Sequence, residues 1–214
     1  ALERQIHSKL FERLAMSRDK ERVLELGRRG QEVSTPEDVV KDPFVLEFLG
    51  LHERPGWLER DLEQAIMDRL QDFLLELGKG FCFVARQQRL TLDGDHFYVD
   101  LVFYNRLLRC FVLIDLKMNK VTHQDLGQMQ MYVHYYDRYQ KTNEEAPTIG
   151  IILGSETNEA MVRITLPEDN TQIHASRYSL YLPTEQQLRK AVMSERRRME
   201  QALRLSGRPQ HLEE

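Results

Sequence analysis

The sequence lacks any long hydrophobic run: its longest apolar stretches are typified by residues 149–153. A membrane-spanning helix needs about 20 consecutive apolar residues, so none is predicted and no membrane partner is expected. The first residues also lack the basic segment followed by an apolar one that marks a secretory signal peptide. These absences favour a cytoplasmic location. Because the chain starts without methionine in the middle of a helical pattern, we expect it to be a piece of a longer protein.

Cysteine is scarce as well. Cys82 and Cys110, the only two, both lie inside apolar strand-like runs and are interpreted as buried, reduced thiols. No group of histidines and cysteines has the spacing of zinc ligands. His123 and His134 flank a predicted helix and are interpreted as surface residues. The composition therefore argues against a disulfide-stabilised domain and against a zinc enzyme.

An excess of positive charge is also missing, since the formal net charge is -4 at pH 7. Global charge thus gives no sign of a nucleic-acid-binding protein, although an enzyme acting on nucleic acid needs only a local basic strip. Residues 186–208 carry seven Arg and Lys residues and are one candidate for such a strip. The alternative, slightly favoured by the interspersed glutamates, is the solvent-exposed face of a charged helix.

Hydrophobic periodicity predicts an α/β domain preceded by helices. The elements expected along the chain are a helical segment over residues 1–30, one or two short helices over 37–54, an amphipathic helix over 58–77, strands over 81–88, 97–104 and 110–117, a helix that opens with a capping box at Thr122, a buried strand over 148–153, shorter strand candidates over 161–166 and 178–182, and a charged helix from residue 184. We expect a helical N-terminal segment over residues 1–55, the tail of a larger N-terminal region. A main domain over 56–190 and a charged C-terminal helix and tail over 191–214 follow it.

Acidic residues interrupt two neighbouring strands of the predicted domain. Asp100 lies within the strand 97–104, and Asp115 and Lys117 end the strand 110–117 after a five-residue link short enough for a hairpin. Residues i and i+2 of a strand share a face, so Asp115 and Lys117 project together. Charges at the end of a buried strand are costly unless something binds there. Two carboxylates beside an ammonium group predict a site for a hard divalent cation and a phosphate.

The sequence resembles the PD-(D/E)xK nuclease superfamily. Asp100 matches its first acid, residues 115–117 match the (D/E)xK triplet, and residues 128–132 match a QxxxY element. Within the superfamily the sequence is similar to the YhcG-like family, in the four stretches 73–81, 100–104, 127–129 and 147–153. The resemblance covers roughly residues 57–190. It implies a restriction-endonuclease-like core of a helix, a three-stranded meander, a helix and further strands in a mixed sheet.

The resemblance also implies a role for each matched residue. Asp100, Asp115 and the backbone carbonyl of Leu116 are expected to hold Mg²⁺ or Mn²⁺, which prefer oxygen ligands. Lys117 is expected to orient or deprotonate the attacking water and to stabilise the charge that develops on the phosphate. Gln128 and Tyr132 lie one helical turn apart and would reach the phosphate or Lys117.

Four further residues are considered for the site. Glu63 falls on the buried stripe of the helix 58–77, where the superfamily often has an acid that completes the metal site; the alternative is a glutamate at the edge of the stripe that reaches solvent. Glu76 competes for this role but is expected to lie off the stripe. Arg86 and Gln87, on the strand before the hairpin, are expected to contact the backbone of the substrate.

These features together predict a metal-dependent nuclease that hydrolyses phosphodiester bonds, with DNA as the expected substrate. By resemblance, a homodimer formed through the N-terminal helices and a role in bacterial defence or DNA processing are further expectations. One alternative is a catalytically silent module that binds nucleic acid or scaffolds a complex on the same fold. Another is a metal-independent interaction protein in which the acids merely cap strands. Asp115 and Lys117 taken alone could also be an ordinary surface ion pair.

Overall fold

The computed structural model describes residues 10–17, 23, 35–51, 57–190, 193, 194 and 197. The chain divides into two compact units, one formed by Ala1–Gly27 with Leu182–Glu214 and the other by Arg28–Tyr181. In the first unit the structure describes helix α2 (Leu10–Met16). The other helices predicted before residue 30, and most of the C-terminal helix, lie outside the described residues. All candidate site residues belong to the second unit.

The second unit is built on one mixed six-stranded sheet, in the order β1-β6-β5-β4-β3-β2. The strands are β1 (Phe44–Val45), β2 (Phe81–Leu92), β3 (Asp95–Asn105), β4 (Cys110–Leu116), β5 (Ile149–Gly154) and β6 (Ile173–Ser179). Strands β2, β3 and β4 form an antiparallel meander. Strands β4, β5, β6 and β1 run parallel to one another.

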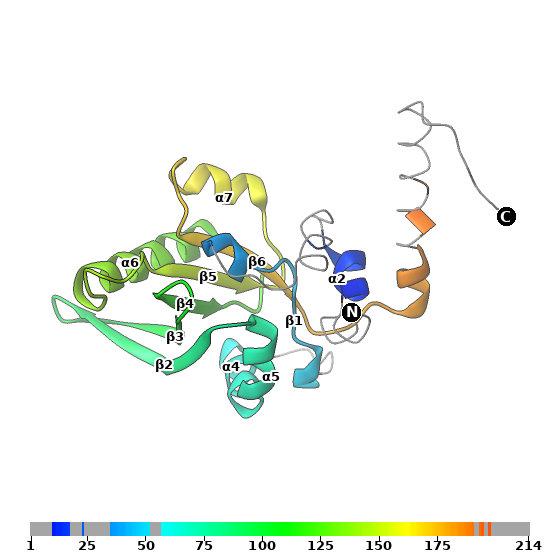
Figure 1. The fold of residues 1–214 in the computed structure, drawn as a ribbon, viewed down its shortest axis with the longest axis horizontal. Helices are drawn as coiled ribbons and strands as arrows, with labels where there is room; N and C mark the ends of the chain where they lie inside the picture. Colours follow the sequence, from blue (N-terminus) through cyan, green and yellow to red (C-terminus); the bar gives the residue numbers. More distant parts are fainter. Residues whose placement is uncertain are drawn as a thin grey trace. The chain divides into compact units, whose positions relative to one another are not determined.

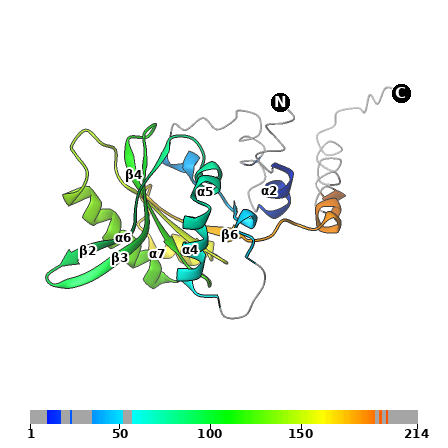
Figure 2. The ribbon, with the colours of Figure 1, turned by 90° about the horizontal axis from the view of Figure 1, so that it is seen from below.

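Helices cover both faces of this sheet (Figure 1). They are α4 (Glu59–Asp68) and α5 (Leu70–Leu77) on one face and α6 (His123–Tyr139) and α7 (Glu159–Thr165) on the other, with two short 3-10 helices, η1 (Pro36–Val39) and η2 (Glu47–Leu49). Seen from below, α4 and α5 follow one another along the near face (Figure 2). None of the described helices combines the length and the apolar character needed to cross a membrane. The order helix, three-stranded meander, helix and further strands confirms the predicted α/β core.

Two hydrophobic clusters, one on each face, account for this layering. Strand β4 contributes to both, because Val112 and Ile114 pack with the residues of α4 and α5 whereas Leu113 packs with those of α6. Strand β5 is buried along its whole length. Continuous apolar runs of this kind are typical of strands covered on both faces. The sheet is thereby fixed between helices, and the ends of its strands can present polar groups.

Helix α6 approaches the sheet most closely at Gly150 of β5. A Cβ atom at this position would lie 2.6 Å from Met129 Cγ and Sδ and 2.9 Å from Val133 Cγ2. Both neighbours are buried side chains of α6. Glycine is therefore required here by the spacing between helix and sheet.

The predicted helix over 58–77 is two helices. Arg69 separates α4 from α5, with φ -121° and ψ 35°. Glu76 is buried together with Phe73 and Leu77, and its Oε1 accepts a hydrogen bond from the backbone N–H of Val45 at 2.8 Å. The expectation that Glu76 lies off the buried stripe is wrong, because the backbone N–H of Val45 in β1 holds its carboxylate in the core.

Other segments also differ from the sequence expectations. Residues 159–165 form α7 in place of a strand, since Asn158 caps the backbone N–H groups of Ala160 and Met161. The last strand runs over 173–179 and so begins earlier than expected. Between the two 3-10 helices, residues 44–46 are fully buried and β1 pairs with β6. The core therefore begins before residue 55, where the sequence suggested a boundary.

Only one of the two cysteines is buried. Both are free thiols, and Cys110 lies in the core, where burial raises its pKa to about 12. Cys82 is exposed, because it lies on β2, the strand at the edge of the sheet. The expectation of two buried thiols is therefore correct for Cys110 and wrong for Cys82.

Two glycine substitutions should change stability in opposite directions. Gly150→Ala should lower the free energy of unfolding by about 1–3 kcal/mol, because the added methyl group overpacks the contact with Met129 and Val133. Gly127→Ala, at an exposed position of α6 with no atom within 4 Å of the new Cβ, should raise it by about 0.5–1 kcal/mol. Urea denaturation followed by circular dichroism measures both. Equal effects of the two variants would contradict the close approach of α6.

Candidate active site

Asp100 and Asp115 meet where the ladder between β3 and β4 ends. The last pair of this ladder is Leu101 with Ile114, and the two aspartates stand one residue beyond it on each strand. Residues directly opposite each other in an antiparallel pair project to the same face. Asp100 Oδ2 accepts a hydrogen bond from the backbone N–H of Leu116 at 2.7 Å. The side chain of Asp100 thus bridges the two strands at the point where their backbone pairing ends.

Asp115 is a buried carboxylate with an incomplete set of partners. Only 3% of the residue is exposed, and its Oδ2 makes no hydrogen bond within the described residues. The ammonium group of Lys117 lies 2.8 Å from this oxygen as an ion pair. Burial and, after it, the charge of Asp100 raise the pKa of Asp115 to about 7, although Lys117 opposes both. The environment therefore favours an additional positive charge beside Asp115.

Lys117 is held at the end of the sheet by its backbone and its side chain. Its N–H donates to the carbonyl of Leu153 on β5 at 2.8 Å. Its Nζ lies 2.8 Å from Asp115, 3.8 Å from Asp125 and 3.9 Å from Glu59. Burial lowers the pKa of Lys117, but the surrounding carboxylates outweigh burial and raise it above its usual value. The group is therefore a fixed cation.

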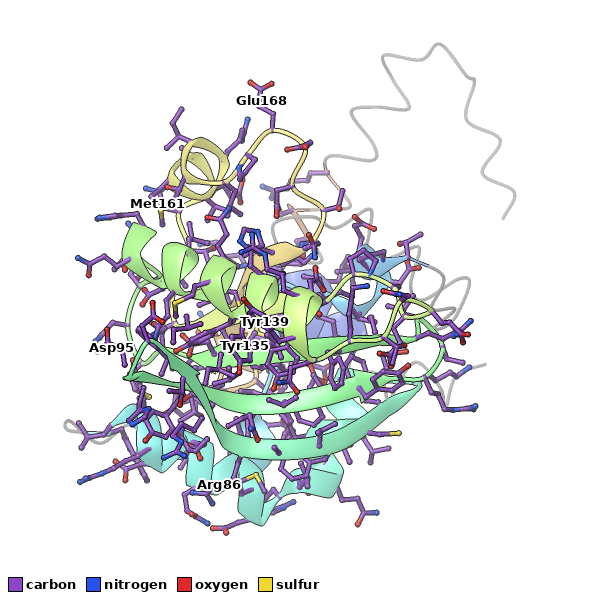
Figure 3. The ribbon with its side chains drawn as sticks, turned by 90° about the vertical axis from the view of Figure 1, so that its left-hand side faces the viewer. Arg86, Asp95, Tyr135, Tyr139, Met161 and Glu168 are labelled. Carbon is purple, nitrogen blue, oxygen red and sulfur yellow. The ribbon has the colours of Figure 1, made fainter. Side chains whose placement is uncertain are left out.

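Glu63 lies beside Asp100 and is linked to it through Gln87. The Gln87 amide donates one hydrogen bond to Glu63 Oε2 and another, at 2.9 Å, to Asp100 Oδ1. Arg86 Nε lies 3.0 Å from Glu63 Oε1, and Figure 3 shows Arg86 on the side of the sheet where α4 and α5 lie. Burial raises the pKa of Glu63, and Gln87 and Arg86 partly oppose this. Both polar residues expected to contact the substrate are thus engaged with the site's own carboxylates.

Gln87 adopts a backbone conformation that is unusual for a strand. Its φ is 46°, in the left-handed region that side chains other than glycine rarely occupy. The pairs on either side, Arg86 with Leu101 and Gln88 with Val99, remain in register. Such conformations cost about 1–3 kcal/mol and concentrate at functional sites. The two hydrogen bonds to Glu63 and Asp100 are the contacts that offset this cost.

Gln128 and Tyr132 connect α6 to β3. The Gln128 amide donates to the Tyr132 hydroxyl, which itself donates to the backbone carbonyl of Tyr98 at 2.8 Å. Tyr132 is fully buried. Burial, followed by the charge of Asp115, raises the pKa of its hydroxyl to about 12. Tyr132 is therefore a neutral group close to the acids, and its hydroxyl hydrogen is used in the hydrogen bond to the Tyr98 carbonyl of β3.

The structure brings together Asp100, Asp115 and Lys117, as predicted, and places Glu63 next to Asp100. It does not gather a third acid with the two aspartates, since no group of three His, Cys, Asp or Glu residues within the described part of the chain could hold a metal ion. The contact of Leu116 with the site is through its N–H. The donor set nevertheless suits a hard cation, because Mg²⁺ often takes one or two protein carboxylates and keeps several waters.

Negative charge dominates the surroundings of the site. The five carboxylates linked by these contacts are Glu59, Glu63, Asp100, Asp115 and Asp125, and the two cations are Arg86 and Lys117. A polyanion meeting this surface would be repelled unless a cation bound first. The charge balance and the buried carboxylate of Asp115 therefore fit a divalent metal ion.

Two contributors were not identified from the sequence as parts of the site. Asp125 caps α6, where its Oδ2 accepts from the N–H of Thr122 at 2.8 Å, and its Oδ1 faces Lys117. The capping pattern was visible in the sequence, but the second contact depends on where α6 starts relative to β4. Glu59, the first residue of α4, gave no sequence signal.

The remaining basic and histidine candidates make none of the contacts described above. Arg189 pairs with Glu185 at 3.0 Å, and both side chains are about four-fifths exposed (78% and 80%). Most other arginines of the segment 186–208 lie outside the described residues. His123 and His134 are exposed, as expected.

Comparison with known proteins agrees with this geometry. A family model described as "YhcG PDDEXK nuclease domain" matches residues 37–193, which is more than half of the chain. A curated protein of Escherichia coli (strain K12), named "Putative nuclease YhcG", is 40% identical over 187 residues. This match covers 87% of the chain and 49% of the relative, so the chain spans about half the length of that protein.

Two solved structures are among those to which this chain is similar. One, "crystal structure of a repair endonuclease from Pyrococcus abyssi", has a TM-score of 0.41 and 17% identity over 59% of this chain and 49% of the other. The second, "Structure of EndoMS-dsDNA2 complex", has a TM-score of 0.41 and 15% identity over 62% and 50%. The family match over residues 37–193 shows that this chain belongs to the YhcG PDDEXK nuclease domain family.

Proposed function

We propose that this domain is a metal-dependent nuclease that hydrolyses phosphodiester bonds of DNA at the site formed by Asp100, Asp115 and Lys117. The observation that carries the proposal is the buried carboxylate of Asp115, opposite Asp100 and 2.8 Å from the ammonium group of Lys117. A like-charged pair of acids in a poorly solvated place is costly unless a cation binds there.

Asp100 and Asp115 would hold Mg²⁺ or Mn²⁺, with the carbonyl of Leu116 as a neutral ligand and Glu63 as a further carboxylate beside Asp100. When bound, such an ion lowers the pKa of a water molecule and neutralises charge on the scissile phosphate. Gln87 keeps Glu63 and Asp100 apart at a fixed separation through its two hydrogen bonds. We assign to Gln87 and Arg86 this positioning role, in addition to contact with the substrate backbone.

Lys117 would orient the attacking water and stabilise negative charge on the phosphate. Its raised pKa keeps it protonated, so charge stabilisation and orientation fit it better than proton abstraction. If Asp115 held a metal ion, its ion pair with Lys117 would weaken, and the ammonium group of Lys117 would then be able to turn towards the phosphate.

Gln128 and Tyr132 would act mainly by position. Tyr132 fixes β3 two residues before Asp100, because its hydroxyl donates to the carbonyl of Tyr98. Gln128 is partly buried, and its amide is directed by Tyr132. Of the two, Gln128 is the one able to reach a bound phosphate.

DNA as substrate, a homodimer, a cytoplasmic location and a role in defence are proposals that rest on the resemblance in sequence. The domain expected over residues 56–190 is the part to which we assign the chemistry. The segment over 1–55 and the tail over 191–214 are assigned no catalytic residue.

Metal-dependent cleavage tests the proposal directly. Supercoiled plasmid should be nicked by the full chain with Mg²⁺ or Mn²⁺ and left intact with EDTA. Asp115→Asn and Lys117→Met should each reduce the rate at least about a hundredfold, as expected for loss of a preorganised charged group. A fluorescence-based gel assay, run in parallel with a single-stranded RNA, gives the rates and the choice of nucleic acid.

Glu144→Gln is the matched control for Asp115→Asn. Glu144 faces Arg109 at 3.7 Å, is 87% exposed and lies near the start of β4, whereas Asp115 lies near its end. The control should cleave at the rate of the unchanged protein. Retained cleavage in Lys117→Met, or cleavage in EDTA, would contradict the assigned site, and binding without cleavage in any metal would favour a silent binding module.

The role given to Tyr132 predicts a change in stability more than in metal binding. Tyr132→Phe removes the donor to the Tyr98 carbonyl in a fully buried place and should lower the free energy of unfolding by about 1–2 kcal/mol. Affinity for Mn²⁺, measured by isothermal titration calorimetry, should stay within about twofold of that of the unchanged protein. This is well below a tenfold change, which corresponds to roughly 1.4 kcal/mol. Loss of Mn²⁺ binding with unchanged stability would show instead that the hydroxyl belongs to the metal site.

A further inference from the structure

The hairpin formed by β2 and β3 extends past the site. Strand β3 pairs with β4 only from Leu101 onwards, so residues 95–100 pair with β2 alone. Figure 1 shows this two-stranded arm reaching beyond the edge of β4. Its turn is Asp93–Gly94, and Figure 3 shows Asp95 at the side of the molecule next to that turn. The arm is thus continuous with Asp100 on one of its strands.

One face of the arm is apolar and packed. Leu90, Phe97 and Val99 belong to the hydrophobic cluster of α6. Leu90 is 2% exposed and Val99 is fully buried. This packing fixes the orientation of the arm, so its other face is turned to solvent.

The solvent face carries a row of polar and aromatic pairs that starts at Asp100. Moving outward, Arg89 stands opposite Tyr98 and Thr91 opposite His96. Thr91 Oγ1 lies 3.0 Å from His96 Nδ1, as expected for side chains that share a face. Arg89, Thr91 and His96 are exposed, and Tyr98 is 46% exposed. None of these pairs is used by the proposed chemistry.

Arg89 and Tyr98 are the members of this row that suit a ligand. The guanidinium group of Arg89 has no hydrogen-bond or ion-pair partner within the described residues. The backbone of Tyr98 is held by the hydroxyl of buried Tyr132, so its ring is presented from a fixed strand. Tyr98 precedes Asp100 by two residues, about 7 Å along a strand, which is the scale of one nucleotide step in an extended chain.

We propose that Arg89 and Tyr98 bind the nucleotide next to the cleaved bond, Arg89 on its phosphate and Tyr98 on the face of its base, and that this base is unpaired. The inference rests on the proposed function and names the substrate class of the same site. An exposed aromatic ring stacks on a base only when the base has left the duplex stack. Insertion of the arm into the major groove is disfavoured, because exposed Asp93 and Asp95 flank the tip and would meet the phosphates lining the groove.

Binding of short oligonucleotides separates this contact from catalysis. Fluorescence anisotropy is measured with Mg²⁺ in the Lys117→Met background, in which no cleavage is expected, for a single strand and for the matching duplex. Tyr98→Ala should weaken binding of the single strand roughly 5- to 150-fold, the range for loss of one stacked base. Tyr98→Phe keeps the ring and should bind as before. Arg89→Met should lower the slope of log affinity against log salt by about 0.7.

Matched controls are available on α6 and α7. Tyr139→Ala removes a tyrosine that is 67% exposed, and Arg163→Met removes an exposed arginine. Neither should change affinity or salt dependence. A fluorescent base analogue in the single strand should be quenched by the protein, and the quench should disappear in Tyr98→Ala but not in Tyr98→Phe.

The outcomes distinguish this inference from the proposed function. Unchanged binding of the single strand in both Tyr98→Ala and Arg89→Met, with urea midpoints showing that the variants fold, would overturn the inference even if plasmid cleavage is normal. An equal loss of affinity for the single strand and for the duplex in Tyr98→Ala would contradict the inference that the bound base is unpaired. Conversely, the protein could cleave no substrate and yet quench the base analogue in a way that Tyr98→Ala abolishes. This outcome would support the nucleotide contact and contradict the proposed nuclease activity.

Discussion

The burial of Asp115 opposite Asp100 is the constraint on which the rest of the site depends. Two like charges face each other where β3 and β4 stop pairing, and one of them is almost inaccessible to water. Each compensating contact is local and specific: the ammonium group of Lys117 on Asp115, and the N–H of Leu116 and the amide of Gln87 on Asp100. A buried charge that loses its partners is costly. The contacts with Asp100 and Asp115 therefore hold these neighbouring groups in place.

Helices from opposite faces of the sheet converge on this one end of β3 and β4. From one face α4 delivers Glu59 towards Lys117 and Glu63 towards Gln87. From the other, α6 delivers Asp125 at its first turn and Tyr132 farther along, which ties it to β3. Because Gly150 lets α6 lie close on β5, the position of its first turn follows from packing in the core. The site is thus positioned by both hydrophobic clusters at once.

The sequence was sufficient for those parts that depend on local pattern. The apolar, strand-forming runs and the short link between them predicted that Asp100 and Asp115 would be neighbours, and they are. The burial of Glu76 depends on its contact with Val45, which is distant in the sequence, so helical periodicity does not predict it. The bridging role of Gln87 depends on a left-handed backbone conformation that no propensity indicates. Sequence pattern thus predicts the elements and the acids, but not contacts between distant segments or those that require an unusual dihedral angle.

The balance of charge at the site links the two ligands that we propose for this domain, a divalent metal ion and the phosphate of a nucleic acid. Five carboxylates and two cations surround the end of β4, so the polyanion and the site repel each other until a metal ion intervenes. Metal and phosphate binding must then be coupled, and each raises the affinity for the other by the same factor. Arg89 stands outside this group of charges, because it has no ion-pair partner in the part of the chain that the structure describes. It can therefore hold a nucleic-acid strand next to the acids before the metal ion and the scissile phosphate are bound together.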